Sequence, residues 1–142
     1  MVLGLLWSNF VYSTIDAEKV KTIKCELGSI KIGDEKFDEE QLKAYYKEGG
    51  SKFEKFKIKK DQIKSNTFKF FDNLWIKDNI ITGTSTVEKE NYGVIARVER
   101  SASIDLNKTL ATVNQEIFIG ENGEFHTVSG LMTLNYSNCA AK

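Results

Sequence analysis

His126 is the only histidine in this chain of 142 residues, and it is the side chain best suited to acid–base or metal chemistry near neutral pH. A zinc site built around one histidine needs three acidic or thiolate ligands, and no spacing in the sequence supplies them. A Ser–His–Asp triad is defined by geometry, so sequence order cannot exclude one, but no G-x-S-x-G motif supports it. We interpret His126 as a strand-end residue, expect no metal ion or cofactor, and favour a non-enzymatic role while leaving enzymatic activity open.

Five carboxylates lie close together in the sequence, at Asp34, Glu35, Asp38, Glu39 and Glu40. A calcium loop alternates oxygen ligands around a glycine and ends in a bidentate glutamate, and this segment lacks that pattern. Negative charge is favoured at the N-terminus of a helix because the helix dipole is positive there. We therefore predict that these carboxylates begin a helix and do not bind a cation.

Eight lysines between Lys47 and Lys69 are interleaved with Phe53, Phe56 and Phe68. Basic residues mixed with aromatic ones are typical of single-stranded nucleic-acid platforms, and they also suit an anionic polymer or a membrane surface. The alternation itself has a simpler interpretation, in which apolar side chains point inward and lysines face water. We favour this solvated face.

The overall charge narrows the classes of partner. Twenty positive and twenty negative side chains balance to a net charge of zero. Only two of the positive residues are arginines, Arg97 and Arg100, and arginine is the usual choice for bidentate phosphate recognition. We expect no nucleic-acid partner and at most peripheral contact with a membrane.

The first residues of the chain are apolar and precede the first charged residue, Asp16. Val11 and Ser13 suit positions −3 and −1 of a signal-peptidase cut, although a basic n-region is missing and the apolar part is short. We predict that residues 1–13 are a truncated signal-peptide remnant and that residues 14–142 form a single β-rich domain. The alternative is that the segment is a first buried strand or docks on the fold.

Cys25 and Cys139 are the only cysteines and lie near the two ends of the predicted domain. A disulfide between them would close a loop that spans most of the chain. On the loop-entropy model, this closure stabilises the folded state by about 4–5 kcal/mol. Such a bond persists in an oxidising compartment, which agrees with the signal-like N-terminus. We predict this disulfide and an exported, periplasmic or secreted protein; the alternative is two free thiols.

One segment, residues 38–48 from Asp38 to Glu48, carries a clear helix signal. Asp38 is an N-cap residue, and Gln41 occupies the N3 position of a capping box. Two glycines follow and end the helix. A stripe at i, i+3 and i+4 spacing gives it one apolar face, made of Leu42, Tyr45 and Tyr46.

The rest of the chain alternates apolar and polar residues in short runs separated by Gly, Asn and Asp. The run over residues 93–106 is the longest, and Arg100 alone interrupts its apolar face. The fold class that follows is all-β, an antiparallel meander of about seven to nine strands closed as a barrel or stacked as a sandwich, plus the short helix. The predicted strands are 21–27, 29–32, 53–59, 67–71, 74–77, 80–88, 93–106, 110–119 and 124–136.

The leading function hypothesis is an exported, non-enzymatic β-domain that binds a small apolar ligand in its interior. Aromatic residues would line that site or, alternatively, fill the core: Tyr45, Tyr46, Phe56, Phe68 and Trp75. The second hypothesis is a protein-interaction or inhibitor module of the cell envelope that acts through an exposed loop. Such a module exposes an aromatic or arginine anchor, and Tyr92 and Trp75, both next to predicted turns, are the candidates.

Overall fold

The computed structural model describes residues 17–121, 124–128 and 130–141. These residues form eleven strands, one 3-10 helix (η1, Ala17–Lys19) and one α-helix (α2, Glu39–Lys47). The strands are β1 Thr22–Ile32, β2 Glu35–Lys36, β3 Phe53–Ile58, β4 Ile63–Ser65, β5 Lys69–Phe71, β6 Asn73–Lys77, β7 Ile80–Asn91, β8 Val94–Asp105, β9 Leu110–Glu121, β10 Glu124–Thr127 and β11 Met132–Ala141.

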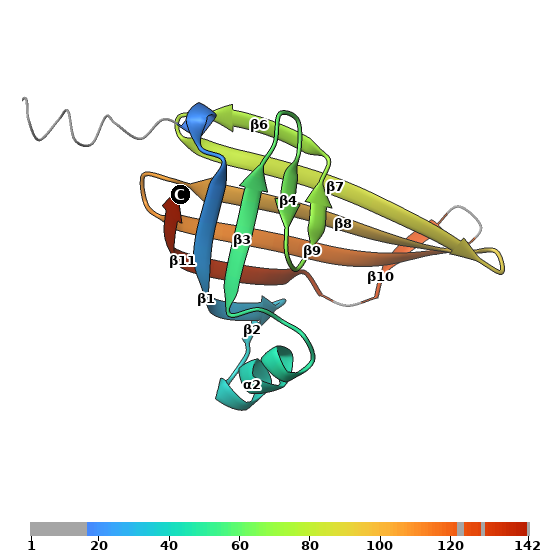
Figure 1. The fold of residues 1–142 in the computed structure, drawn as a ribbon. Helices are drawn as coiled ribbons and strands as arrows, with labels where there is room; N and C mark the ends of the chain where they lie inside the picture. The colour runs from blue at the N-terminus through green and yellow to red at the C-terminus, as the bar shows by residue number, and fades with distance from the viewer. Residues whose placement is uncertain (1–16, 122–123, 129, 142) are drawn as a thin grey trace, which may run out of the picture.

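The strands form one antiparallel sheet in the order β5-β4-β3-β1-β11-β9-β8-β7-β6, with β2 paired to β1 and β10 paired to β9. β5 and β6 lie at opposite ends of this order, yet only Asp72 separates them in the chain. The sheet therefore curls into a nearly closed barrel (Figure 1). This confirms the predicted antiparallel all-β fold and decides for the barrel over the sandwich.

Gly83 of β7 shows how closely the two ends of the sheet approach. A Cβ atom at Gly83 would lie 2.7 Å from Ile63 Cδ1 of β4 and 2.9 Å from Phe71 Cβ of β5, which is closer than van der Waals contact. The glycine thus lets β4 and β5 lie directly against β7. Side chains fill the barrel interior, and the largest buried ones are Phe56, Phe71, Ile23, Ile30, Ile63, Ile81, Ile104 and Leu134.

Cys25 of β1 and Cys139 of β11 form the predicted disulfide, across a sequence separation of 114 residues. β1 and β11 are also hydrogen-bonded neighbours in the sheet, so the bond joins two strands that already pair. The disulfide is compatible with export. No helix among the described residues is long and apolar enough to cross a membrane. The predicted signal-peptide remnant, residues 1–13, lies outside the described residues.

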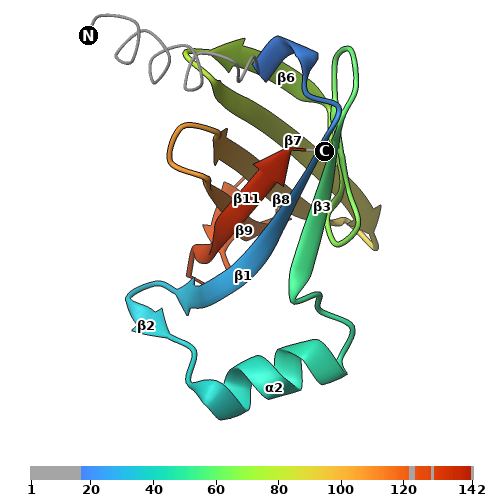
Figure 2. The ribbon, with the colours of Figure 1, turned by 60° about the vertical axis from the view of Figure 1, so that its left-hand side comes forward.

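The helix α2 lies at one end of the barrel, in the connection between β2 and β3 (Figure 2). Its predicted capping box is present: Asp38 Oδ1 accepts a hydrogen bond from Gln41 N (2.8 Å), and Gln41 Oε1 accepts one from Asp38 N (2.9 Å). No residue of the helix is fully buried. Its apolar stripe packs half-buried against the core through Leu42, Tyr45 and Tyr46.

Several strand predictions need correction in length or number. β4 lies at Ile63–Ser65, where no strand was predicted, because three residues are too few to show an alternation. β7 continues to Asn91, three residues beyond the predicted end at 88. The extra length matters because β7 and β8 pair along their whole length and so extend past the barrel.

The single strand predicted over residues 124–136 is two strands, β10 and β11, and both pair with β9. Thr127 lies opposite Phe118, and Met132 lies opposite Gln115. Four residues of the chain therefore lie between these pairs where β9 has only two. The surplus residues cannot stay in register, so the ladder is interrupted there.

Candidate functional site

The inward face of β7, β8 and β9 consists of rows of residues that lie opposite one another on the three strands. Two rows are fully buried in the barrel, and we call them the covered half of this face. They are Ile81–Ile104–Ala111 and Gly83–Ala102–Val113. The alternation of each strand thus supplies the core with apolar side chains, as predicted.

The same face continues beyond the barrel. The next row, which we call the polar row, consists of Ser85, Arg100 and Gln115. Further out lie two mainly apolar rows that are not fully buried, the uncovered half: Val87–Val98–Ile117 and Lys89–Ala96–Ile119. In Figure 1, β7, β8 and β9 run well past the ends of β3, β4 and β5. We call this part of the three strands, together with β10, the sheet extension.

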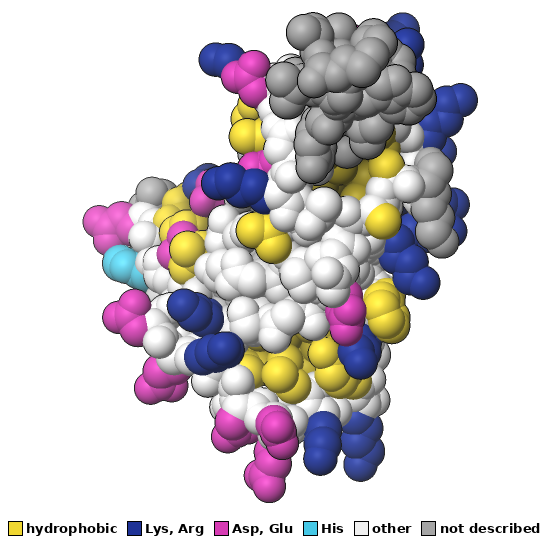
Figure 3. All heavy atoms as spheres, turned by 90° about the vertical axis from the view of Figure 1, so that its left-hand side faces the viewer, with side chains coloured by type: hydrophobic (Ala, Val, Ile, Leu, Met, Phe, Trp, Pro, Cys, Tyr) yellow, Lys and Arg dark blue, Asp and Glu magenta, His cyan; other side chains and the backbone are white. Residues whose placement is uncertain are grey.

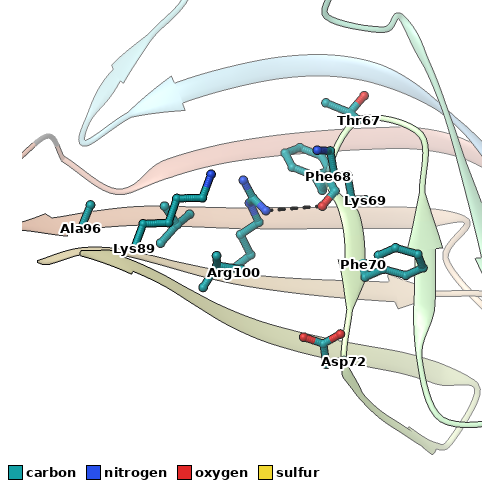
Figure 4. A pocket seen from close by; sticks show the side chains of 10 residues that line it. Thr67, Phe68, Lys69, Phe70, Asp72, Lys89, Ala96 and Arg100 are labelled. Carbon is teal, nitrogen blue, oxygen red and sulfur yellow. Dashed lines mark hydrogen bonds between the residues drawn. The ribbon is translucent and has the colours of Figure 1, made fainter. Parts of the chain in front are cut away.

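A groove of about 460 Å³ lies between the sheet extension and the chain that leads into β5. Val87, Ala96 and Val98 line one side of it. Phe68 and Phe70 line the other side. Figure 4 shows the side chains of β7 and β8 extending toward the turn that precedes β5. Apolar side chains are thus present on both sides of the groove, which suits a ligand with a hydrophobic part.

Glu54 of β3 fixes the side of the groove that carries Phe68. Its carboxylate is fully buried, and its Oε1 atom accepts hydrogen bonds from Ser65 Oγ and Thr67 N, both at 2.9 Å. Its Oε2 atom accepts one from Thr67 Oγ1 at 3.0 Å. Ser65 Oγ in turn accepts a hydrogen bond from Phe68 N at 3.0 Å. This network positions the turn between β4 and β5.

Burial raises the pKa of Glu54, and the hydrogen bonds from Thr67 and Ser65 oppose that rise only in part. Burial, followed by the negative charge of Glu54, also raises the pKa of Tyr45 and of Tyr136. Each contact of the Glu54 carboxylate is made to the turn beside it. We therefore assign Glu54 a positioning role.

Arg100 reaches from β8 into the groove. Its Nε atom donates a hydrogen bond to Gln115 Oε1 (2.7 Å), and its Nη1 atom donates one to the Phe68 carbonyl (3.4 Å), which is drawn in Figure 4. Among the described residues, no carboxylate lies within ion-pairing distance of the guanidinium. Burial lowers the pKa of Arg100 from its usual value, but an arginine remains charged at neutral pH. The hydrogen-bond partners of its guanidinium are thus neutral groups.

The edge of the groove carries three further charged side chains, Lys69, Lys89 and Asp72. With Arg100 the lining therefore has three positive groups and one negative group. The protein as a whole has no net charge, so the excess is local to the groove. The potential in this region favours a ligand with a negative group.

The five aromatic residues predicted to line a ligand site lie in different places. Phe56 is fully buried in the core, and Phe68 lines the groove. Tyr45 and Tyr46 contact each other, with ring centroids 5.8 Å apart, at the helix end of the barrel. Trp75 lies on β6 and is 51% exposed. The structure brings only Phe68 to the groove.

Tyr92 and Trp75, the two candidates for exposed anchors, are both exposed in the structure. Tyr92 occupies the tip of the β7–β8 hairpin and is 98% exposed, with a backbone φ of 53°. Left-handed backbone is unusual for a bulky residue. The tip of the sheet extension thus presents an aromatic side chain directly to solvent.

The lysine-rich stretch forms the solvated outer face that the alternation predicted. Lys55, Lys57 and Lys64 are exposed, whereas Phe56 is buried between them in sequence. Lys57 lies directly opposite Lys64, and Lys24 lies directly opposite Lys55. Figure 3 shows Lys and Arg side chains along one side of the molecule. Like charges in such pairs are unfavourable, which solvent exposure moderates.

Glu54 and Ser85 are among the residues of the site that were not singled out from the sequence. Glu54 has the same strand parity as Phe56, so the alternation of β3 alone indicates that its side chain points inward. Ser85 shares the parity of Ile81 and therefore belongs to the inward face of β7. In both cases the signal was a polar residue at an apolar position, as it was for Arg100.

The described residues include no group of three or more His, Cys, Asp or Glu side chains placed to hold a metal ion. His126 is exposed on β10. No protein-family model, curated protein or solved structure matches this chain.

Proposed function

We propose that this protein is a binding protein for a small, mainly apolar molecule, which it holds in the groove between β5 and the sheet extension. The observation that carries the proposal is a groove of about 460 Å³ with apolar side chains on both sides. Ligand pockets commonly have volumes of roughly 300–1,000 Å³ and combine apolar walls with a few polar groups. Since core side chains fill the barrel interior, the groove replaces the interior as the place for the ligand.

Both sides of the groove are held in place by hydrogen bonds. The hydrogen bonds of Glu54 fix the turn that carries Phe68. The opposite side is a continuous part of the β7–β8 ladder. A site built on such supported elements can bind without a large rearrangement, which preserves affinity.

The test is the binding of 1-decanol, measured by isothermal titration calorimetry, to the wild type and to two matched variants. Val98→Glu places a charge in the groove, whereas Ile95→Glu places the same charge on the opposite face of the same strand. We expect Val98→Glu to weaken binding at least tenfold and Ile95→Glu to leave it nearly unchanged. The proposal is contradicted if the wild type does not bind 1-decanol, or if both variants lose affinity for it to the same extent.

Tyr92 favours a second candidate function, that of an interaction module. An aromatic side chain that is 98% exposed at a hairpin tip is a ready anchor for a protein partner. The expected result is that a partner purified from the host envelope binds the wild type and loses affinity at least tenfold for Tyr92→Asn. Equal affinity for both proteins contradicts this role.

We also propose that the protein works outside the cytoplasm. The disulfide supports this placement, because cytosolic reductants keep most thiols reduced. Intact mass of the protein isolated from its own host is the test. A chain that lacks about the first thirteen residues and gains two daltons on reduction is expected; a full-length reduced chain contradicts export.

A further inference from the structure

Among the described residues, one buried side-chain polar atom has no hydrogen-bond partner, the Oγ atom of Ser85. Ser85 as a whole is 4% exposed. A buried hydroxyl in this state is costly, and most such groups in native proteins are satisfied. Ser85 lies directly opposite Arg100 in the β7–β8 pairing, on the same inward face. The unpaired hydroxyl is therefore a neighbour of the arginine that reaches into the groove.

Arg100 has spare hydrogen-bonding capacity as well. A guanidinium carries five N–H donors, and the structure assigns two hydrogen bonds to this one, to Gln115 Oε1 and to the Phe68 carbonyl. Both partners are neutral. A partly buried cation that is paired only with neutral groups retains a strong attraction for an anion. Ser85 and Arg100, which lie opposite each other in the β7–β8 ladder, thus both have hydrogen-bonding capacity that the described residues leave unused.

The polar row lies between two apolar regions of the same face. On one side is the covered half, and on the other side are Ala96 and Val98 of the groove. The covered half is filled, so an apolar chain can lie only on the groove side. A chain placed along Ala96 and Val98 brings its end group to Arg100, because β8 carries these residues two apart on one face.

We propose that Ser85 and Arg100 form a headgroup subsite for a carboxylate, so that the ligand of the groove is an amphipathic monocarboxylate. This inference rests on the proposed function, since it names the class of ligand that the groove takes. The planar guanidinium of Arg100, which lines the groove, matches a carboxylate in a bidentate geometry. Ser85 is buried opposite Arg100 and does not itself line the groove, so its hydroxyl donates only to a carboxylate oxygen that enters between the two side chains. Lys69 and Lys89 at the edge of the groove add favourable charge without fixing the geometry.

The test compares decanoate with 1-decanol at pH 8, where the acid is ionised, for the wild type and the Arg100→Gln variant. We expect the wild type to prefer decanoate by about tenfold or more, which is the usual effect of charge-assisted hydrogen bonds. Arg100→Gln should lose that preference while it still binds 1-decanol. Retained alcohol binding shows that the groove survives the loss of the contact between Arg100 and Phe68.

Arg97→Gln is the matched control. Arg97 is the other arginine of β8, but it lies on the outer face, where it pairs with Glu88 at 2.8 Å and covers the ring of Phe125. The control should keep the preference for decanoate. If neither ligand binds the wild type, the proposed function fails. If both bind equally, the groove is a ligand site but the carboxylate subsite is wrong.

Ser85→Ala separates a binding role from a structural one. Removal of an unsatisfied buried hydroxyl should leave the thermal midpoint unchanged or raise it. The same variant should weaken decanoate binding about threefold to tenfold and leave 1-decanol binding unchanged. A lower midpoint with unchanged decanoate affinity would assign Ser85 to the fold alone and overturn its place in the subsite.

Discussion

The covered and uncovered halves of the β7–β9 face have the same alternating pattern but different surroundings. In the covered half, Ile104 and Val113 are fully buried. In the uncovered half, Val87, with the same apolar character, is 42% exposed. The polar row divides the two. The alternation of residues within a strand therefore determines which of its faces is apolar. Whether that face is buried depends on the other strands that pack against it.

Strand lengths explain why the cover ends where it does. β7, β8 and β9 each have 12 residues, whereas β4 and β5 each have 3. At a rise of about 3.3 Å per residue, the long strands span roughly 40 Å and the short ones roughly 10 Å. The sheet extension is therefore a direct consequence of the shortness of β4 and β5. The groove lies where the cover by β5 stops.

The largest predicted effect concerns the barrel that contains the covered half, in which the disulfide joins β1 to β11. A variant with Cys25→Ser and Cys139→Ser should lose about 4–5 kcal/mol of unfolding free energy, because a loop of more than a hundred residues is no longer closed. Urea unfolding with and without a reducing agent measures this difference. The loss should also appear in the reduced wild type; a stable reduced protein would contradict the prediction.

A matched pair of isoleucines compares the two halves directly. Ile104→Ala in the covered half should lower the unfolding free energy by about 2–5 kcal/mol, because it creates a cavity in a filled core. Ile117→Ala in the uncovered half should lower it by about 1 kcal/mol or less, since less apolar surface is buried there. Chemical denaturation of both variants measures the contrast. Equal losses would mean that the uncovered half belongs to the core after all.

Much of the covered half could be predicted from the sequence, because local patterns determine it. The sequence predicts the apolar positions of residues 93–106, the capping box at Asp38 and the disulfide partners, and the structure contains all three. Strand pairing could not be predicted in the same way. β4 is too short to show a period, and the break between β10 and β11 depends on the register of β9.

The candidate groove could be predicted only in fragments. Arg100 stood out as the one interruption of an apolar run, and Phe68 was named among the ligand-lining aromatics. The contact between Arg100 and Phe68 depends on the turn between β4 and β5. Glu54 holds this turn through hydrogen bonds to residues 11 and 13 positions away in the sequence. Such contacts leave no periodic signal. Trp75, by contrast, was named for the same site and lies exposed on β6.

The pH dependence of stability tests whether Glu54 supports the side of the groove nearest the core. Because burial raises its pKa in the folded protein, the folded state binds this proton more tightly than the unfolded state. The contribution of Glu54 to stability should be fully present below its unfolded pKa and should decline as pH rises through the raised folded pKa. The unfolding free energy of the wild type, measured relative to that of Glu54→Gln from pH 4 upward, should therefore fall as the pH rises.

Glu40→Gln is the control for this measurement. Glu40 is exposed in the first turn of α2, so its loss should leave the pH profile close to that of the wild type. A difference between wild type and Glu54→Gln that stays flat with pH would show that the carboxylate does not titrate in the predicted direction.

The smallest predicted effect lies at the far end of the uncovered half, at Tyr92. Its side chain is 98% exposed and its φ is 53°, so it contributes little packing while its backbone lies in the left-handed region. Tyr92→Asn should stabilise the protein by about 0.5–1 kcal/mol, because asparagine tolerates this conformation and Asn-Gly favours the tight hairpin turn. A small rise in the thermal midpoint measures it. A gain in stability would show that the tyrosine is retained against the preference of the turn, as expected for a residue that contacts a partner; a loss would show that Tyr92 supports the hairpin itself.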